Sequence, residues 1–460
     1  MNHEKYRSFI AHKQHKNEKT GFKPKSLNPK LFAHQRVANI FALERGKAAL
    51  FLDTGLGKTG CEVVFADECL RQTNKPSLIL TPLAVAKQMQ KEAANIFDIE
   101  TNIARGPDTI TSGINILNYE RLKDINPNQF GAIILDESSV LKSYGGRVKN
   151  MLVRNFKDVP FKLAATATPA PNDHMEIGNH AEFLDVMGSM EMLCRWFVND
   201  TSEASQKWRL KGHASADFWA WVASWARAAS LPSDLGGDDD GYILPPLSTN
   251  IHVVDVDRTQ DTNGLLFRIP DQSATSIHKE KRMTLEDRMG MSAELANTGD
   301  PVIVWCETND ESAALAKMVD DCIEVKGSMT IDQKENALWA FTNGSKRAIV
   351  TKKKIAGFGL NWQHCNHQVH SSVTYSYEAY YQAVRRSWRF GQKSPVNIDV
   401  VMSDTERGIW STTERKARDH ERLKSEMSKA MQGAQGTVSK KAYTKEPDFI
   451  FPSWLQSEAA

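Results

Sequence analysis

The chain has 460 residues with a formal net charge of +2; 41% of them are hydrophobic and 25% are charged. This length exceeds one ordinary core, so we expect two or three domains. No apolar run reaches the roughly 18 residues that a membrane span needs, and the first residues lack the apolar stretch of a secretory signal. We therefore expect no membrane partner. The six cysteines are scattered without a CxxC pair, which predicts reduced core thiols in a cytoplasmic protein.

The chain begins with a basic arm, residues 1–30. Eight lysines and arginines stand there against two glutamates. Such an arm suits a phosphate backbone, although its composition is equally typical of a solvated tail.

Residues 31–175 alternate short apolar runs with helix-like segments, which is typical of a parallel α/β sheet. Distinctive polar residues follow these runs, at the edge where open α/β sheets bind ligands. The expected strands cover residues 48–53, 77–82, 114–119, 132–137 and 162–168.

Residues 176–245 differ in composition, with five tryptophans and a closing Gly/Asp/Pro-rich stretch. We expect a helical insertion and a linker. Trp221 and Trp225 are four residues apart, which favours a buried helical face over a base-stacking platform. Trp208, near Arg209 and Lys211, is the better candidate for contact with a nucleic-acid strand.

A second α/β sheet is expected over residues 246–403, followed by a charged helix and tail over residues 404–460. Its strands are predicted at 302–307, 323–327, 347–351, 368–374 and 397–403. Helical periodicity fits residues 309–320, 330–342 and 377–389. Two similar sheets in one chain predict two lobes with a cleft between them.

The string FLDTGLGKTG at residues 51–60 follows a strand and opens a helix, as a phosphate loop requires. Backbone N–H groups and the helix N-terminus would face the phosphates. Lys58 would reach the β- and γ-phosphates, and Thr59 would hold Mg²⁺. Leu52 stands where the standard pattern has its first glycine.

A buried strand ends in Asp136 and Glu137. Mg²⁺ prefers a carboxylate such as that of Asp136, and Glu137 suits the orientation and deprotonation of water. A helix N-cap is the alternative reading of this pair, but its position in the sheet of the phosphate loop favours ATP hydrolysis.

The string QAVRRSWRFGQ at residues 382–392 places Arg386 and Arg389 three residues apart on an expected helix. Two arginines that face a γ-phosphate across a cleft would stabilise transition-state charge. A salt-bridged surface helix is the alternative.

In this order the strings resemble the superfamily 2 helicases, specifically the Swi/Snf-like branch. The nearest likeness is to the compact DEAD/DEAH-box-type helicases of bacteriophages and prophages. The resemblance runs from residue 31 to 403 and implies two RecA-like parallel-sheet lobes, with ATP and Mg²⁺ bound between them. The form DxGLGKT is this branch's own, so Leu52 fits it. The string DESS departs from DEAD or DEAH after its two carboxylates.

The resemblance also implies roles for further residues. Gln35 would read adenine, and Gly55, Gly57 and Gly359 would let the backbone approach the nucleotide closely. Thr166, Thr168 and Gln382 would couple hydrolysis to movement, and Arg385 receives no role. The residues implied to contact nucleic acid are Thr81, Pro82, Asn118, Tyr119, Lys352, Asn361 and Trp362.

The sequence therefore predicts a DNA-stimulated ATPase that moves along duplex DNA with little sequence preference. An RNA helicase is one alternative. An ATP-gated module that recruits replication, recombination or anti-defence proteins is another. A zinc site among the histidines of residues 364–370 is disfavoured, because no second ligand pair accompanies them. The expected compartment is the cytosol of a bacterium or of an infected host cell.

Overall fold

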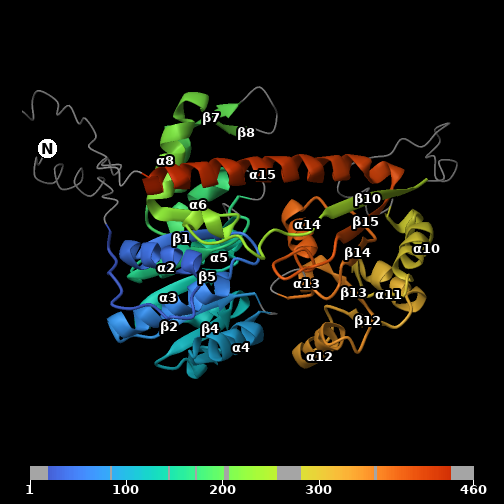
Figure 1. The fold of residues 1–460 in the computed structure, drawn as a ribbon, viewed down its shortest axis with the longest axis horizontal. Coiled ribbons are helices and arrows are strands. Elements are labelled where there is room, and N and C mark those ends of the chain that lie inside the picture. The colour runs from blue at the N-terminus through green and yellow to red at the C-terminus, as the bar shows by residue number, and fades with distance from the viewer. Residues whose placement is uncertain are drawn as a thin grey trace, which may run out of the picture.

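The computed structural model describes residues 19–82, 85–142, 146–170, 174–200, 207–255, 281–356 and 360–436. Two parallel sheets lie next to each other along the long axis of the molecule, and one long C-terminal helix crosses both (Figure 1). The expected fold class is confirmed. Among the described residues, no helix combines the length and apolar character that crossing a membrane requires.

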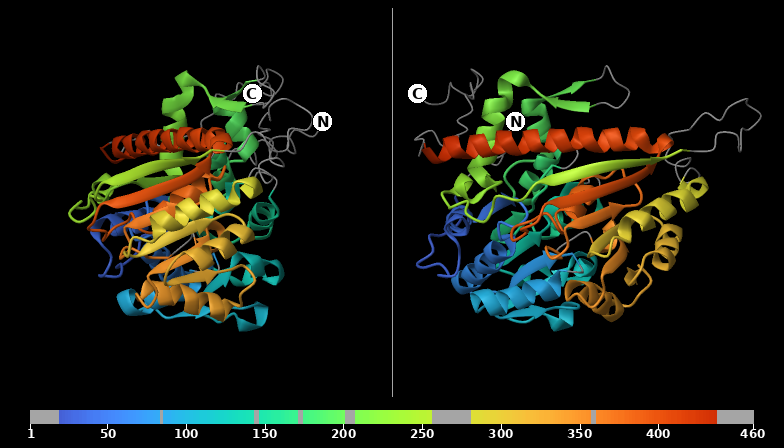
Figure 2. Two further views of the ribbon diagram at one scale, coloured as in Figure 1. Left: turned by 90° about the vertical axis from the view of Figure 1, so that its right-hand side faces the viewer. Right: turned by 45° about the vertical axis from the view of Figure 1, so that its right-hand side comes forward.

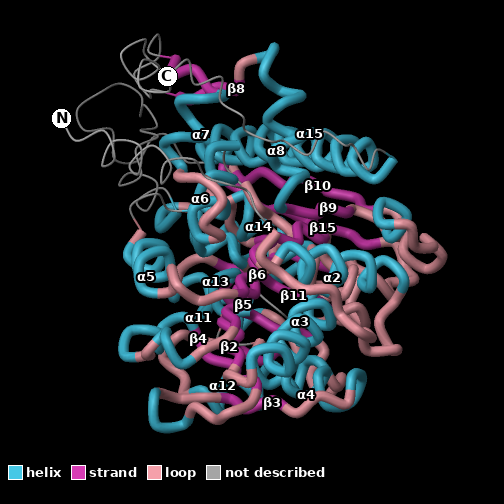
Figure 3. Tube along the Cα trace, turned by 90° about the vertical axis from the view of Figure 1, so that its left-hand side faces the viewer, coloured by secondary structure: helices cyan, strands magenta, loops and turns pink. Residues whose placement is uncertain are grey.

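The first sheet and its helices form lobe 1. Its seven parallel strands run in the order β3-β4-β2-β5-β6-β1-β9. Helices cover both faces of the sheet (Figure 3), so the central strands are buried on both sides and read as continuous apolar runs. The strands are β1 (Lys47–Leu52), β2 (Ser77–Thr81), β3 (Thr101–Ile103), β4 (Ile114–Asn118), β5 (Ala132–Asp136), β6 (Phe161–Ala165) and β9 (Ala226–Ala229). The helices are α2 (Ala33–Arg45), α3 (Lys58–Thr73), α4 (Ala86–Phe97), α5 (Arg147–Asn155) and α6 (Ile177–Phe183).

The second sheet and its helices form lobe 2. Its six parallel strands run in the order β10-β15-β14-β11-β13-β12. The strands are β10 (Leu247–Val254), β11 (Val302–Cys306), β12 (Cys322–Val325), β13 (Ala348–Lys352), β14 (His367–His370) and β15 (Val396–Ser403). The helices are α10 (Leu285–Ala296), α11 (Asn309–Met318), α12 (Ile331–Thr342), α13 (Lys353–Ala356) and α14 (Tyr377–Val384).

The sequence predicted a helical insertion between the lobes, but this segment also contains strands. It contains α7 (Ser189–Trp196), an antiparallel hairpin of β7 (Phe197–Asp200) and β8 (Lys207–Leu210), and α8 (Ser215–Trp225). The strand after α8, β9, pairs with β1 and so belongs to the lobe 1 sheet. Trp221 and Trp225 are buried, as expected, and their rings lie 5.3 Å apart.

The C-terminal helix α15 (Arg407–Gly436) spans both lobes, and the hairpin projects beyond it (Figures 1 and 2). At its start, the Thr413 hydroxyl donates to the Thr374 carbonyl of lobe 2. Further along, Leu423 and Met427 join the hydrophobic core of lobe 1 and the insertion. The sequence predicted a charged helix here, and the structure shows that one of its faces packs into the core.

Candidate active site

The phosphate loop joins β1 to α3. Gly55 and Gly57 adopt positive φ angles of 99° and 74°, a region that favours glycine. A Cβ atom added at Gly57 would lie 2.0 Å from Gln35 Nε2, and one at Gly55 would lie 2.9 Å from Cβ of Phe390 in lobe 2. Glycine is therefore required at both positions by conformation and by space, and lobe 2 packs directly on the loop.

Gln35 lies at the start of α2 and contacts this loop. Its Nε2 donates to the carbonyls of Leu56 and Gly57, at 3.3 and 3.2 Å, and its Oε1 accepts from the amide of Phe32 at 2.9 Å. The amide side chain is thus fixed next to the loop, and its expected contact with adenine stays a prediction.

Lys58 and Thr59 begin helix α3, directly after the loop. The Lys58 ammonium donates to the Leu52 carbonyl at 3.2 Å. This contact keeps the ammonium close to the loop, where the positive end of the α3 dipole also points.

Asp136 and Glu137 lie at the carboxyl end of β5, in the same sheet as β1, the strand that precedes the phosphate loop. Asp136 is 7% exposed, and its Oδ2 accepts a 2.8 Å hydrogen bond from the Thr81 hydroxyl. Burial, and then the charge of Glu137, raise the pKa of Asp136 to about 7. A buried carboxylate that is costly to ionise suits a divalent cation, so the hard oxygens of Asp136 and Thr59 fit Mg²⁺.

Glu62 was missed by sequence reasoning. It lies in the second turn of α3 and is fully buried. Burial, followed by the charge of Asp136, raises its pKa well above the ordinary value. The signal in the sequence was a glutamate one helical turn after Lys58, on an otherwise apolar face.

Two of the residues with an expected coupling role lie next to Glu137. The Thr166 hydroxyl donates to Glu137 Oε2 at 3.3 Å and accepts from the Thr168 amide at 3.1 Å. Ser138, which follows Glu137, lies 3.1 Å from Nε2 of the buried His180. Ser138, the third residue of the DESS string, therefore contacts α6 through His180. The sequence did not predict a role for His180.

The arginines of lobe 2 follow α14 and do not lie on it. The helix expected to reach residue 389 ends at Val384, because the amides of Arg386 and Ser387 bond three residues back and no longer four. Both Arg386 and Arg389 donate to the carbonyl of Leu360, at 2.8 and 3.0 Å, so their side chains still lie together.

Arg386 is buried and Arg389 is half-buried, and both bond to neutral oxygens within the described residues. Arg386 also donates to the carbonyl and the side-chain oxygen of Gln382. Burial, and then the charge of Arg389, lower the pKa of Arg386 to about 9. Burial lowers the pKa of Arg389 to about 10, although the charge of Glu92 acts in the opposite sense. Asp136 and Glu137 act on Arg386 in the opposite sense, so it lies within electrostatic range of them. Such clustered buried cations suit an anion.

Arg385, to which the sequence gave no role, crosses to lobe 1. Its Nη2 lies 2.9 Å from Asp53 Oδ1, at the start of the phosphate loop. No motif in the sequence links Arg385 to Asp53, so this pair was not foreseen.

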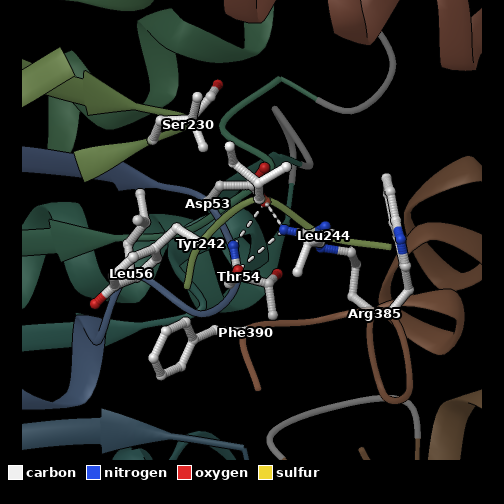
Figure 4. Close-up of a pocket in the computed structure, with 11 residues that line it drawn as sticks. Asp53, Thr54, Leu56, Ser230, Tyr242, Leu244, Arg385 and Phe390 are labelled. Atoms are coloured by element: carbon white, nitrogen blue, oxygen red, sulfur yellow. Dashed lines mark hydrogen bonds and ion pairs between the residues drawn. The ribbon is translucent and has the colours of Figure 1, made fainter. Parts of the chain in front are cut away.

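A cavity of about 290 Å³ adjoins the phosphate loop between the lobes (Figure 4). Asp53, Thr54 and Arg385 form its polar wall, and Tyr242 of the linker stacks on Phe390, with ring centroids 4.3 Å apart. The dashed lines in Figure 4 mark the bonds of Asp53 to Arg385 and to the Thr54 amide. An aromatic pair beside a phosphate loop suits a planar base.

Some residues expected to contact nucleic acid lie elsewhere. Thr81 is fully buried on Asp136, and Trp362 is fully buried between Trp305 and Phe341. Tyr119 donates its hydroxyl to the Asp136 carbonyl at 2.7 Å. Thr81 and Trp362 are thus internal supports and not surface contacts, whereas Tyr119 also lines a cavity between the lobes.

The remaining expected contacts are more accessible. Pro82 lines a second cavity between the lobes, of about 520 Å³. Asn361 is exposed, Asn118 is half-buried, and Lys352 donates to Asn309 Oδ1 at 2.7 Å. Gly359 lies outside the described residues.

Ion pairs between the lobes border the second cavity. Lys87 of α4 pairs with Glu335 of α12, and Lys142 pairs with Glu378 of α14. Glu137 lines the same cavity, so the cavity reaches from the lobe boundary to the expected catalytic glutamate.

Two parallel-sheet lobes with a phosphate loop in one and arginines in the other match the arrangement that the sequence resemblance implied. Family models agree in chain order. A model described as "Type III restriction enzyme, res subunit" matches residues 27–171, and one described as "Helicase conserved C-terminal domain" matches residues 280–391. The chain thus contains two regions similar to helicase domains, one in each lobe.

The relatives are of the Swi/Snf type. The mouse (Mus musculus) DNA annealing helicase and endonuclease ZRANB3 is 22% identical over 450 residues, covering 86% of this chain and 41% of the mouse protein. A Caenorhabditis elegans homolog of the SWI/SNF-related matrix-associated actin-dependent regulator of chromatin subfamily A-like protein 1 is 28% identical over 191 residues, covering 36% and 27% of the two chains. This chain therefore spans less than half the length of either relative.

A solved structure shares the fold. Saccharomyces cerevisiae Dbp5 bound to RNA and ADP BeF3 has a TM-score of 0.53 and 11% identity, with 88% of this chain and 98% of that chain covered. This likeness concerns the arrangement of the two lobes alone.

Proposed function

We propose that the protein is an ATP-driven DNA motor, in which ATP hydrolysis is stimulated by DNA and coupled to movement along the duplex. The observation that carries this proposal is the packing of the loop after α14 on the phosphate loop. Phe390 meets Gly55, and the nearby Arg386 and Arg389 both donate to the Leu360 carbonyl. Each lobe contributes half of the site, so binding and release of ATP would move the lobes relative to each other.

The residues of the chain divide the chemistry among them. Lys58 and the loop amides bind the phosphates, and Tyr242 and Phe390 hold the base in the cavity of about 290 Å³. Gln35 fixes the loop beside it. Glu137 accepts a proton from the attacking water, and Thr166 fixes its carboxylate. Arg386 and Arg389 stabilise charge that develops on the γ-phosphate.

Thr59 and Asp136 would hold Mg²⁺. When bound, the ion would supply positive charge that neutralises the phosphate oxygens. Thr81 and Tyr119 orient Asp136 for that task from inside the lobe.

DNA is favoured over RNA because the mouse relative is named a DNA annealing helicase and because the GLGKT and RFGQ strings are of the Swi/Snf form. Backbone contacts that carry little sequence information would give weak sequence preference. The likeness to phage and prophage helicases, the cytosolic location and the partners in replication, recombination or anti-defence stay predictions.

A side-by-side ATPase assay with duplex DNA, single-stranded DNA and RNA tests the proposal. We expect duplex DNA to stimulate turnover most, and Lys58→Ala to abolish turnover with every polymer. Strongest stimulation by RNA would favour an RNA helicase. Equal turnover with and without each polymer would exclude a motor and favour an ATP-gated recruitment module.

A further inference from the structure

The carboxylate of Asp53 is held from three separate parts of the chain. Arg385 Nη2 of lobe 2 lies 2.9 Å from Oδ1, and the hydroxyl of Tyr381 on α14 donates to the same oxygen. Lys424 Nζ of α15 donates to Oδ2 at 2.7 Å. The Thr54 amide donates to Oδ1 at 2.6 Å. One carboxylate therefore joins the phosphate loop, lobe 2 and the C-terminal helix.

This cluster is shielded from water, so its charges matter. Asp53 is 7% exposed and Arg385 is 5% exposed. Burial by itself would raise the pKa of Asp53, but Arg385 and Lys424 hold it well below the ordinary range. Removal of one partner from a buried ion pair is far more costly than removal from an exposed pair, because a charge is left uncompensated.

The two cations are attached to different moving parts. Arg385 belongs to lobe 2 and also donates to the Thr54 carbonyl at 2.9 Å. Lys424 belongs to the half of α15 that packs on lobe 1, where its neighbour Leu423 is in the core and the Ser428 hydroxyl donates to Asp234 Oδ1 at 2.7 Å. When lobe 2 moves away, Arg385 leaves Asp53 and Lys424 stays.

We propose that Asp53 is the fixed half of a latch between the lobes, with Arg385 as its moving half and Lys424 as the counter-ion that keeps Asp53 paired when the lobes part. Arg385 and Lys424 are positioning residues, which act on nucleotide through the phosphate loop. Arg385 favours the closed state. Lys424 lowers the cost of opening, because it spares Asp53 from being buried without a cation. The nucleotide part of this proposal rests on the proposed ATPase function.

The latch predicts opposite effects for two cations on one carboxylate. Arg385→Met should speed release of a fluorescent ADP analogue about fivefold, and Lys424→Met should slow it by about the same factor, within the usual range of coupling energies. The readout is stopped-flow dissociation from the full chain. Lys424→Arg, which keeps the charge, and Arg422→Met, which removes a mostly exposed cation from the same helix, should match the wild type.

Two further measurements guard against a folding defect. In an Asp53→Asn background, both cation substitutions should lose their effect on release, because they act through that carboxylate. Spin labels on cysteines at the exposed Ile96 of α4 and Met318 of α11, after Cys194→Ser, report the distance between lobes without nucleotide. Arg385→Met should widen this distance distribution and Lys424→Met should narrow it.

Effects of Arg385→Met and Lys424→Met in the same direction, or no effect of either, would overturn the latch. If the wild type binds no ADP, the ATPase proposal fails instead, and the label distances alone decide the latch. Opposite shifts of the distance then support it, and equal shifts reject it.

Discussion

Glu137 has a φ of 51°, in the left-handed region that a glutamate seldom adopts. Such a conformation persists where the surroundings fix it, and it is common at active sites. Here Tyr119 holds the preceding carbonyl, and Thr166 holds the Glu137 carboxylate. The turn directs Asp136 and Glu137 to different neighbours, which suits a cation ligand beside a general base.

We expect Glu137→Gln to bind ATP as tightly as the wild type and to lower the rate of hydrolysis by about 10²–10⁴-fold, the usual contribution of a general base. Gln keeps the size and can still accept from Thr166, but it cannot take the proton. Binding of a fluorescent ATP analogue and release of phosphate measure the two effects. Glu286→Gln, at an exposed glutamate of α10, serves as the control. Normal hydrolysis by Glu137→Gln would show that another group is the base.

Arg386 and Arg389 should differ when each is replaced by alanine. Arg389 makes one described hydrogen bond, to Leu360, whereas Arg386 makes three, two of them to Gln382. Arg389→Ala should therefore lower hydrolysis by about 10³-fold or more and leave the melting temperature nearly unchanged. Arg386→Ala should lower both, because it leaves buried acceptors of lobe 2 unpaired. Wild-type turnover in Arg389→Ala would show that this guanidinium does not act on the phosphate.

The sequence was informative where chemistry limits the choice of residue. Lys58, Asp136 and Glu137 follow strands that the apolar runs predicted correctly, so their convergence could be inferred. Thr81 and Arg385 could not be placed in this way. The role of Thr81 depends on whether its hydroxyl faces out of the lobe or in, and that of Arg385 depends on a partner in the other lobe.

At the scale of elements, the tryptophan-rich segment is continuous with lobe 1. Helix α8 leads directly into β9, which pairs with β1. The Trp225 ring packs edge-on against Phe51 of β1, with centroids 6.1 Å apart. The hairpin β7–β8 is therefore connected through α8 to β9, which pairs with β1, the strand that leads into the phosphate loop.

Trp225→Ala should consequently destabilise the protein by about 3–5 kcal/mol, since it removes a large, fully buried side chain. Trp208 of β8 is only partly buried, so Trp208→Ala should cost much less. Urea unfolding of the two variants measures the difference. Equal losses of stability would mean that the hairpin is as tightly packed as the helix.

Strands β9 and β10 were both missed by the sequence, β9 within the segment expected to be helix and linker and β10 at the start of lobe 2. The sequence of β9, ARAA, lacks the branched and aromatic residues that favour strands. It forms a strand because the edge of β1 is available to pair with it. Strand β10 is an edge strand with several exposed residues, so it has no continuous apolar run, and its pairing with β15 depends on tertiary structure.

For the whole molecule, the net charge of +2 is too small to attract DNA on its own. Binding must depend on local groups of lysine and arginine, which displace counterions from the phosphates. We expect the DNA concentration for half-maximal ATPase stimulation to rise at least about tenfold between 50 and 200 mM salt. Duplexes of unrelated sequence should give the same values. A response independent of salt would argue against phosphate contacts as the main grip.

Helix α15 has 30 residues, so it is a rod of about 45 Å fastened to lobe 2 near one end and to lobe 1 along the other. A helix anchored to both lobes in this way can serve as an axis of rotation between them. The lobes can turn about its axis or bend it slightly, but they cannot slide apart along it. We therefore expect the lobes to rotate relative to each other during each ATP cycle. The distance moved along DNA would then be set by the angle of that rotation.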